Sequence, residues 1–383
     1  MRKVVVVGVG MTKFGKFPEI PVEKLGREAT WDAIKDAGMS PRDIQVAYLG
    51  NLMERRETGF NSCAAQEILR GVGIRGIPIT RVENACASGS TAFREAWMAV
   101  GSGMYDIALA VGVEKLNGRG PAPLARVGDT LEGIAGFSPP GMWAMRAQRH
   151  MEQYGTTLEQ LAKVAVKNRR HGKLNPRAHY PKEVTVGEVR QSPMICYPLT
   201  LLDSCPTTDG GAAAVLCSEE AAARFTTKPV YVAAAALKSG TYEGLRNIEV
   251  NEIEKRVAKE AYEKAGIGPG DLDLAEVHDC FTIAEIVRIE NLGFCKEGEG
   301  GRMAEEGITQ LGGKFPINPS GGLLCKGHPI GATGVAQVAE LVWQLRGEAG
   351  PRQVPGAKAG LTHCSGGFVG QDTGASTVII LKR

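Results

Sequence analysis

The chain has 383 residues, of which 43% are hydrophobic and 23% charged, and its formal net charge is +3. This length and balance are typical of a soluble globular protein with two or three domains. Charges of both signs are mixed along the chain, which argues against a nucleic-acid surface, and no apolar run approaches the roughly 18 residues that a membrane span needs. The nine scattered cysteines include no CxxC pair and the start of the chain does not resemble a signal peptide, so we expect a reducing, cytoplasmic location.

The first part of the chain alternates apolar strand patterns with helical patterns. In order, these patterns predict a strand at 4–9, a helix at 22–37, a strand at 44–49, a helix at 87–100 and a strand at 107–113. Gly38 is a typical C-terminal cap for the first helix. Gly8 and Gly10 suggest a dinucleotide-binding turn, but Lys13 stands where its third glycine should be, so we interpret this stretch as an ordinary strand-to-loop turn.

A segment from Lys115 to about Ser204 interrupts this alternation. It is rich in Gly, Pro, Arg and Met, and its helical patches lie at 142–154 and 158–170. Inserted loops on a rigid scaffold often carry substrate contacts. We therefore interpret the segment as an inserted loop domain that lies over the active site.

The second part of the chain repeats the pattern of the first. It predicts a strand at 230–236, a helix at 253–265, a strand at 272–277, a helix at 330–345 and strands at 359–363 and 377–381. Residues 37–41 and 265–269 are closely similar in sequence, with Ala, Gly and Pro at the same places. The repeat predicts two duplicated halves, 1–228 with the loop domain and 229–383, each an α/β unit with a parallel sheet covered by helices.

Cys86 and His328 occupy equivalent places in the two halves, since each opens a helix after a strand and has a glycine three residues further on. A pseudo-twofold axis between the halves would bring the two turns together at the carboxyl ends of the strands, where ligands bind. A cysteine at a helix N-terminus feels the positive end of the helix dipole, which favours its thiolate. Pro329 suits the first turn of a helix and would hold His328 at a fixed angle.

Two further segments end strands at the same edge and add candidate site residues. They are His278-Asp279-Cys280-Phe281 and His363-Cys364-Ser365-Gly366-Gly367. One interpretation is a metal site, with Cys325 and His328 spaced as CxxH. Metal ligation would consume the nucleophile, so we favour covalent acyl transfer with no metal.

Three motifs resemble the signatures of the thiolase superfamily, and the resemblance covers essentially the whole chain. They are Asn84-x-Cys86-x-Ser88-Gly89, Asn318-Pro-Ser-Gly321-Gly322 and Gly327-His-Pro-Ile-Gly-Ala-Thr-Gly334. The His278-Asp-Cys-Phe281 form resembles the sterol-carrier-protein type and its archaeal and bacterial acetyl-CoA acetyltransferase-like relatives. The resemblance implies the thiolase fold, with five layers in the order α-β-α-β-α, and cleavage or formation of a 3-oxoacyl-CoA.

The resemblance also implies roles for individual residues. Cys86 carries the acyl group. His328 activates Cys86 and helps bind the thioester oxygen of the second acyl group, and His278 takes the place of the asparagine that orients a water in that first oxyanion hole. The backbone N–H groups of Cys86 and Gly366 form the second oxyanion hole. A second cysteine moves the α-carbon proton: this sequence keeps both Cys280 and Cys364, and we favour Cys280. The matched motifs add two substrate-site residues, Asn318 and Gly331.

The same resemblance implies that CoA is the co-substrate and that no metal or redox cofactor is required. It implies a homodimer or tetramer, and it favours a small separate partner with a zinc ribbon and an OB-like fold. A decarboxylating condensing enzyme of the ketoacyl-synthase kind and a non-catalytic acyl-CoA-binding homologue remain alternatives. The acyl substrate and the physiological direction are left open by the sequence.

Overall fold

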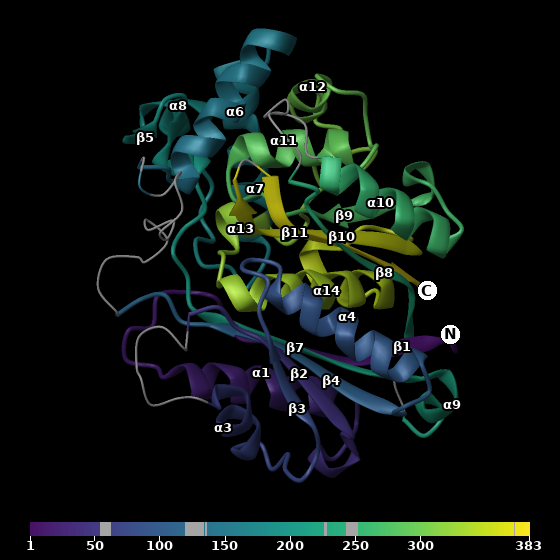
Figure 1. The fold of residues 1–383 in the computed structure, drawn as a ribbon. Helices are drawn as coiled ribbons and strands as arrows, with labels where there is room; N and C mark the ends of the chain where they lie inside the picture. Colours follow the sequence, from purple (N-terminus) through teal and green to yellow (C-terminus); the bar gives the residue numbers. More distant parts are fainter. Residues whose placement is uncertain (54–62, 119–133, 135, 226–227, 243–251, 371) are drawn as a thin grey trace.

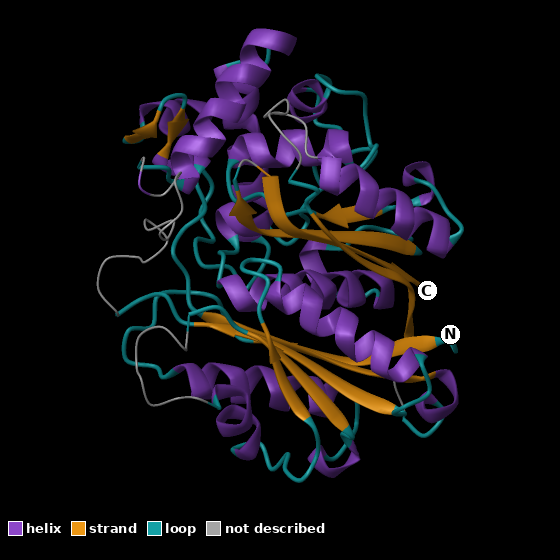
Figure 2. Cartoon of the chain, in the orientation of Figure 1, coloured by secondary structure: helices purple, strands orange, loops and turns teal. Residues whose placement is uncertain are grey.

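The computed structural model describes residues 1–53, 63–118, 134, 136–225, 228–242, 252–370 and 372–383. Two sheets lie on either side of a central pair of helices, α4 (Ser88–Gly101) and α14 (Ile330–Arg346), and further helices cover the outer face of each sheet (Figures 1 and 2). The five layers expected for the thiolase fold are present. Residues 119–133 and 135 of the predicted loop domain lie outside the described residues.

The first sheet comes from the N-terminal half. Its strands run in the order β3 (Ile79–Val82), β2 (Val46–Gly50), β4 (Ile107–Glu114), β7 (Gly210–Ser218) and β1 (Val4–Met11). The central strands β1, β4 and β7 are buried along their whole length, as strands covered by helices on both faces should be. Helices α1 (Val22–Asp36) and α3 (Ala64–Arg70) cover the outer face, and α9 (Glu219–Ala222) follows β7.

The second sheet repeats this plan. Its strands are β8 (Val230–Ser239), β11 (Asp372–Lys382), β10 (Ala359–Val369) and β9 (Leu274–Glu276), and its outer helices are α10 (Glu252–Ala265) and α11 (Thr282–Asn291). The two sheets meet at a short antiparallel pairing of β1 with β8. Short 3-10 turns at Pro41–Asp43 and Pro269–Asp271 sit at equivalent places in the two halves, in agreement with the duplication.

The expectation of parallel sheets is wrong for one strand in each half. β2 pairs in parallel with β3 and β4, but β7 runs antiparallel to both β4 and β1. In the second half β11 runs antiparallel to β10 and β8, because the chain turns back directly from Val369 to Asp372. A tight hairpin of this kind can only join antiparallel strands.

The interpretation of Gly8 and Gly10 as a strand-to-loop turn is also wrong. Both lie inside β1, where an added Cβ would come within 2.2 Å of the carbonyl oxygens of Ala33 and Ala29. These glycines therefore let helix α1 approach the strand closely.

Helices of the loop domain lie over the C-terminal half (Figure 1). They are α6 (Pro139–Tyr154), α7 (Leu158–Lys173) and α8 (Val186–Gln191), with the small hairpin β5 (Met194–Cys196) and β6 (Leu199–Thr200) and a 3-10 turn at Leu201–Asp203. α7 packs against α11, α12 (Gly300–Glu305) and α13 (Gly322–Cys325). The helical patches expected at 142–154 and 158–170 are confirmed as α6 and α7.

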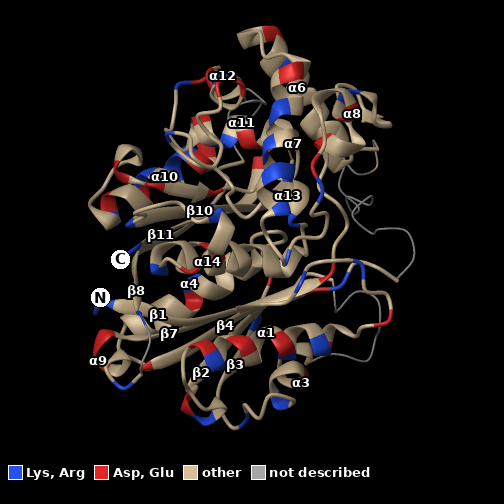
Figure 3. Cartoon of the chain, turned by 180° about the vertical axis from the view of Figure 1, so that it is seen from behind, with Lys and Arg blue, Asp and Glu red and all other residues tan. Residues whose placement is uncertain are grey.

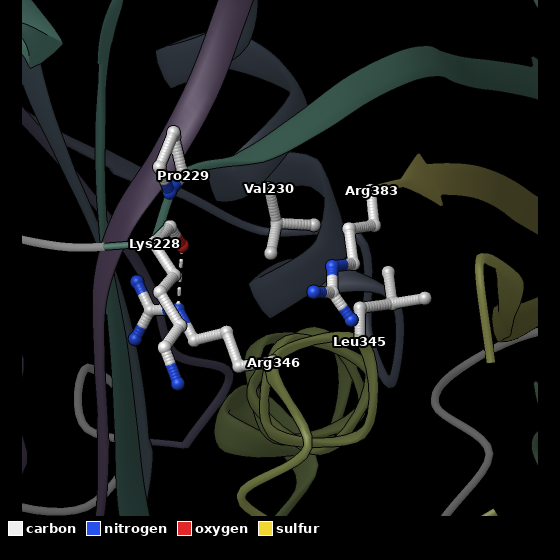
Figure 4. A pocket seen from close by; sticks show the side chains of 6 residues that line it. All are labelled: Lys228, Pro229, Val230, Leu345, Arg346 and Arg383. Carbon is white, nitrogen blue, oxygen red and sulfur yellow. Dashed lines mark hydrogen bonds between the residues drawn. The ribbon is translucent and has the colours of Figure 1, made fainter. Parts of the chain in front are cut away.

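The far end of α14 fastens the two halves together. The Arg346 guanidinium donates to the backbone oxygens of Lys228 (2.8 Å) and Val7 (2.8 Å) and to the Asp36 carboxylate (2.7 Å). A crevice lined by Lys228, Arg346 and Arg383, among others, lies beside these contacts (Figure 4). It lies at the end of α14 opposite to His328, and its lining has no cysteine or histidine.

The outer surface carries charges of both signs. Lys and Arg alternate with Asp and Glu over the helices seen from behind in Figure 3, for example along α10 and α12. Within the described part of the chain, every helix is too short or too polar to cross a bilayer.

Candidate active site

Cys86 sits on a tight elbow that leads from β3 into α4. Ala85 has a φ of +47°, a left-handed conformation that a non-glycine residue adopts only when its surroundings enforce it. The Ser88 hydroxyl enforces it here: its oxygen accepts from the Asn84 N–H (3.0 Å) and its hydrogen goes to the Ala85 carbonyl (2.6 Å). The elbow holds the Cys86 thiol at the N-terminus of the central helix α4.

Three groups converge at this elbow. The Cys86 sulfur and one ring nitrogen from each of His278 and His328 all lie within 4.8 Å of one another, and the two imidazole rings are 4.9 Å apart. Among the described residues this trio also forms a group that could hold a metal ion. The structure thus brings together the cysteine and histidine that the duplication predicted to be neighbours.

The hydrogen bonds assign opposite tautomers to the two histidines. Nδ1 of His278 accepts the backbone N–H of Ser365 at 3.2 Å, so its proton resides on Nε2, a buried atom with no hydrogen-bond partner in the described part of the chain. Nδ1 of His328 lies 2.7 Å from the Thr333 hydroxyl, whose own hydrogen goes to the Pro329 carbonyl (3.0 Å). His328 therefore donates through Nδ1 and offers a lone pair on Nε2.

Burial keeps the whole trio uncharged. It lowers the pKa of His328 to about 3 and that of His278 well below its ordinary value, with the Arg288 cation adding to both effects. Burial, with smaller contributions from Cys364 and Cys280, raises the pKa of the Cys86 thiol well above its ordinary value. This shift is opposite in direction to the one expected from the helix dipole, because loss of solvent around the sulfur is its largest cause.

The two other candidate thiols lie in different surroundings. Cys364 is buried behind His278, with its sulfur 3.1 Å from the Cys86 carbonyl oxygen and 3.6 Å from Nδ1 of His278, and burial raises its pKa to about 12. Cys280 is partly exposed, and its sulfur lies 3.8 Å from Nη1 of Arg288. Burial raises the pKa of Cys280, while Arg288 acts to lower it.

Arg288 is a central residue that the sequence analysis missed. This α11 side chain is 2% exposed, donates from Nη1 to the His278 carbonyl and from Nε to the Glu254 carboxylate (3.3 Å), and lies 4.8 Å from the Trp143 ring centre. An arginine within an apolar helix pattern does not by itself indicate that its side chain reaches the active site. Cys205, also missed, donates its backbone N–H to the Cys280 carbonyl (2.9 Å).

Asn318 lies behind the site, and both ends of its side-chain amide form hydrogen bonds within the protein. Oδ1 accepts the Val277 N–H at 2.8 Å and Nδ2 donates to Glu285 at 2.9 Å, so the side chain holds the strand end that presents His278. Asp279 performs a similar task by accepting the N–H groups of Leu323 (2.7 Å) and Leu324 (3.3 Å) at the start of α13. The polar atoms of both residues are bound within the protein.

Gly331 and Gly366 are required by close packing. A Cβ on Gly331 would lie 2.6 Å from the carbonyl oxygens of Gly50 and Val113, so only glycine lets the start of α14 reach the first sheet. A Cβ on Gly366 would lie 2.0 Å from the Asn84 oxygen and 2.8 Å from the Cys86 nitrogen. Gly366 therefore lies directly against the Cys86 elbow.

The alternative metal pair of Cys325 and His328 is not assembled. The Cys325 sulfur donates to the Tyr180 carbonyl (3.0 Å) and packs against Gly172, so it belongs to the underside of α13. A cysteine and a histidine at paired helix N-termini, with a second neutral histidine at a strand end, on a five-layered α/β scaffold, are typical of an enzyme of acyl transfer through a thiol.

Comparison with known proteins names the family. The family model described as "Thiolase, N-terminal domain" matches residues 4–220, and that described as "Thiolase C-terminal domain-like" matches residues 236–383. The chain belongs to the thiolase family. It is a thiolase-type acyltransferase, which cleaves or forms 3-oxoacyl-CoA thioesters.

Three curated relatives illustrate the range of the family. The "Acetyl-CoA acetyltransferase" of Methanothermobacter thermautotrophicus is 46% identical over 97% of this chain and 98% of its own length. "Sterol carrier protein 2" of Bos taurus is 40% identical over 94% of this chain and 70% of its own. "Benzoylsuccinyl-CoA thiolase subunit BbsB" of Thauera aromatica is 40% identical over 96% and 95%.

Solved structures agree with the fold. A chain of the "Ltp2-ChsH2(DUF35) aldolase" superposes with a TM-score of 0.83 at 26% identity, covering 98% of this chain and 97% of that one. Human mitochondrial 3-ketoacyl-CoA thiolase superposes with a TM-score of 0.76 at 18% identity, covering 100% and 98%.

Proposed function

We propose that this chain cleaves and forms 3-oxoacyl-CoA with Cys86 as the acyl-carrying nucleophile. The observation that carries the proposal is the convergence of the Cys86 sulfur with His278 and His328 within 4.8 Å. Relatives carry names that range from acetyl-CoA to benzoylsuccinyl-CoA, so the acyl group is the variable part of the reaction.

In the cleavage direction, Nε2 of His328 takes the Cys86 proton as the sulfur attacks the C3 carbonyl of the substrate. Collapse of the adduct breaks the C2–C3 bond, leaving the acyl group on Cys86 and the electron pair on the enolate of the departing acyl-CoA. Cys280 gives its proton to C2 of that enolate. CoA then attacks the acyl-cysteine thioester, the proton of its thiol passes to Cys280, and Cys86 regains its own proton from His328.

Two sets of donors would stabilise the negative oxygens of these steps. The Nε2–H of His278 has no partner within the described residues, and we assign it to the enolate oxygen, directly or through one water. The backbone N–H groups of Cys86 and Gly366 are assigned to the acyl-enzyme carbonyl. A buried donor without a partner costs stability unless a ligand uses it, which supports the first assignment.

Cys280 is proposed as the acid and base at C2, in preference to Cys364. Proton transfer needs a group that reaches both protonation states near the working pH. Burial raises the pKa of both thiols, but Arg288 lies 3.8 Å from the Cys280 sulfur and acts against the rise there, whereas the pKa of Cys364 is raised to about 12. Cys364 is better suited to hold the elbow through the Cys86 carbonyl.

We propose that the reaction uses CoA as co-substrate and no metal or redox cofactor. A metal ion on the trio would bind the Cys86 sulfur and the His328 lone pair, which are the two atoms that this chemistry needs free. The decarboxylating alternative does not need an acid at C2, since loss of carbon dioxide creates the carbanion. The presence of Cys280 beside Arg288 therefore favours thiolase chemistry.

A second candidate function is aldol cleavage, because one similar structure is named an aldolase. That reaction releases a free aldehyde or ketone from a 3-hydroxyacyl-CoA and leaves no acyl group on the enzyme. Incubation with CoA and 3-oxohexanoyl-CoA, and separately with 3-hydroxyhexanoyl-CoA, distinguishes the candidates. Thiolysis yields butyryl-CoA and acetyl-CoA from the first substrate only, whereas aldol activity yields butyraldehyde from the second.

We further propose a cytoplasmic homodimer or tetramer that works with a small zinc-ribbon, OB-fold partner. All nine cysteines are free thiols, which suits a reducing compartment. One relative is named a subunit, and the name of one similar structure joins two proteins, which supports a partner. Co-purification from the native host with bound zinc would support it, and full activity of the isolated chain would argue against it.

A further inference from the structure

Arg146 is a buried cation for which the described part of the chain provides incomplete hydrogen bonding. It is 2% exposed, and its Nε and Nη1 atoms have no hydrogen-bond partner there. The guanidinium carbon lies 4.7 Å from the ring centre of Trp143, on the same face of α6, and 5.8 Å from that of Phe368. Aromatic rings compensate a desolvated cation only in part.

Glu254 and Asp372 are the carboxylates whose charges act most strongly on Arg146. Glu254 is the buried carboxylate of this region, and it already accepts from Nε of Arg288 (3.3 Å), from Asn291 (3.1 Å) and from the Ser365 hydroxyl (3.2 Å). The buried carboxylate is therefore already bound to Arg288, and no hydrogen bond joins it to Nε or Nη1 of Arg146. Burial lowers the pKa of Arg146 to about 10, so the side chain still carries its charge at neutral pH.

Arg146 lies on the Cys280 side of the site. Trp143 packs at 6.1 Å against Phe281, the residue after Cys280, and Trp143 also faces Arg288. The Arg146 charge acts on the Cys280 thiol but is not among the principal groups that act on Cys86. Phe368, which lies over the guanidinium, is itself partly exposed, so an aromatic side chain at the rim covers the cation.

We propose that Arg146 is a specificity residue that binds a carboxylate carried by the acyl-CoA substrate, an inference that rests on the thiolase function proposed above. The planar guanidinium suits a carboxylate, because two parallel N–H groups can bond its two oxygens. Cys280 works on C2 of the substrate, so we expect the carboxylate on a C2 branch. A bound carboxylate would accept from the N–H groups of Arg146 that have no partner in the described part of the chain.

Two pairs of substrates test the proposal with the wild-type protein. The first pair is acetoacetyl-CoA bearing a carboxymethyl or a propyl group at C2, and the second is 3-oxoadipyl-CoA and 3-oxohexanoyl-CoA. In each pair the carbon skeletons are similar in size, and one member carries a carboxylate. The proposal predicts a higher kcat/KM for the charged member of at least one pair, and the pair that shows it identifies which half of the substrate carries the charge.

Arg146→Gln then isolates the side chain, because it keeps much of the volume and removes the charge. The preference for the charged member should fall about 100-fold, as expected when one partner of a buried ion pair is lost. Arg146→Lys should restore part of it. Arg169→Gln is a matched control, since Arg169 is a buried loop-domain arginine that stacks on Tyr180 (5.1 Å) beside Cys325 and is not among the principal groups that act on Cys86 or Cys280, and it should leave the preference unchanged.

Three results would overturn the proposal. The wild type could prefer the neutral member of both pairs, or Arg146→Gln could slow both members of a pair equally, which would assign Arg146 to packing or to the electrostatics of Cys280. An equal loss of the preference for the charged substrate in Arg169→Gln would show that the effect comes from the loop domain in general and not from Arg146. Thiolysis of the neutral substrates by the wild type would still support the proposed function, so the two failures are distinguishable.

Discussion

His278 and His328 face each other at 4.9 Å in opposite tautomers, one held by a backbone amide and the other by a hydroxyl. His278 presents an N–H that has no partner in the described part of the chain, and His328 presents a lone pair. Burial keeps both neutral, so neither role depends on a protonated imidazole in the free protein. The pair therefore divides the work: one ring donates to a substrate oxygen and the other accepts the Cys86 proton.

The hydroxyl of Thr333 should act as a positioning group for His328. Thr333→Val leaves the buried Nδ1–H without an acceptor, a loss of about 1–3 kcal/mol or roughly a 5- to 150-fold fall in the rate of Cys86 acylation. Thr333→Ser keeps the oxygen and should recover most of the rate. Rapid-quench acylation kinetics measure the effect, and an equal loss in both variants would contradict the hydrogen-bond account.

Substitution of Cys280 and substitution of Cys364 should affect different steps of the reaction. Cys280→Ala should retain acyl transfer to Cys86 but lose about 10²- to 10⁴-fold in exchange of the C2 protons of acetyl-CoA with deuterated water, the range expected for a general acid or base. Cys364→Ala should keep exchange within a factor of about 10 of the wild type. Exchange that survives in Cys280→Ala and disappears in Cys364→Ala would reverse the assignment.

Arg288 should set the pH range of the condensation direction, where Cys280 must lose its proton before it can act as the base. Arg288 lowers the pKa of Cys280, so Arg288→Met should raise that pKa and move the rise in the exchange rate to higher pH. Arg288→Lys keeps the charge and should show a smaller displacement. The measurement is the pH profile of C2-proton exchange, and an unchanged profile in Arg288→Met would exclude this electrostatic role.

Buried neutral histidines should make the protein sensitive to acid. Burial lowers the pKa values of His171, His328 and His363 to about 3, whereas the unfolded chain binds protons near pH 6.5. Between these values the unfolded state holds more protons, so stability falls as the pH falls below 6.5, by about 1.4 kcal/mol per pH unit for each histidine. His171→Gln should reduce the proton uptake on unfolding at pH 5 by about one, measured by calorimetry in buffers of different ionisation heat. Uptake equal to that of the wild type would contradict the buried neutral state of His171.

The duplication in the sequence was sufficient to pair Cys86 with His328, because equivalent turns of two similar halves meet across their pseudo-twofold axis. It did not predict β7, whose glycine- and alanine-rich start lacks the β-branched residues that mark a strand. Arg288 of α11 stacks on Trp143 of the inserted domain, and Arg146 of that domain stacks on Phe368 of β10; such stacking across elements leaves no local pattern. The tautomer of His278 depends on the Ser365 amide, which no side-chain motif encodes. The division of the halves at residues 228 and 229 stays a prediction.

The most direct test of the account is acyl trapping on Cys86. The purified chain is incubated with acetyl-CoA and with 3-oxoacyl-CoAs of increasing bulk, then digested, and the added mass is mapped to a peptide. The account predicts an acyl group on the peptide that contains Cys86, absent in Cys86→Ala and retained in Cys280→Ala. An acyl group on another cysteine, or none on Cys86 from any donor with or without a zinc-ribbon partner, would contradict it.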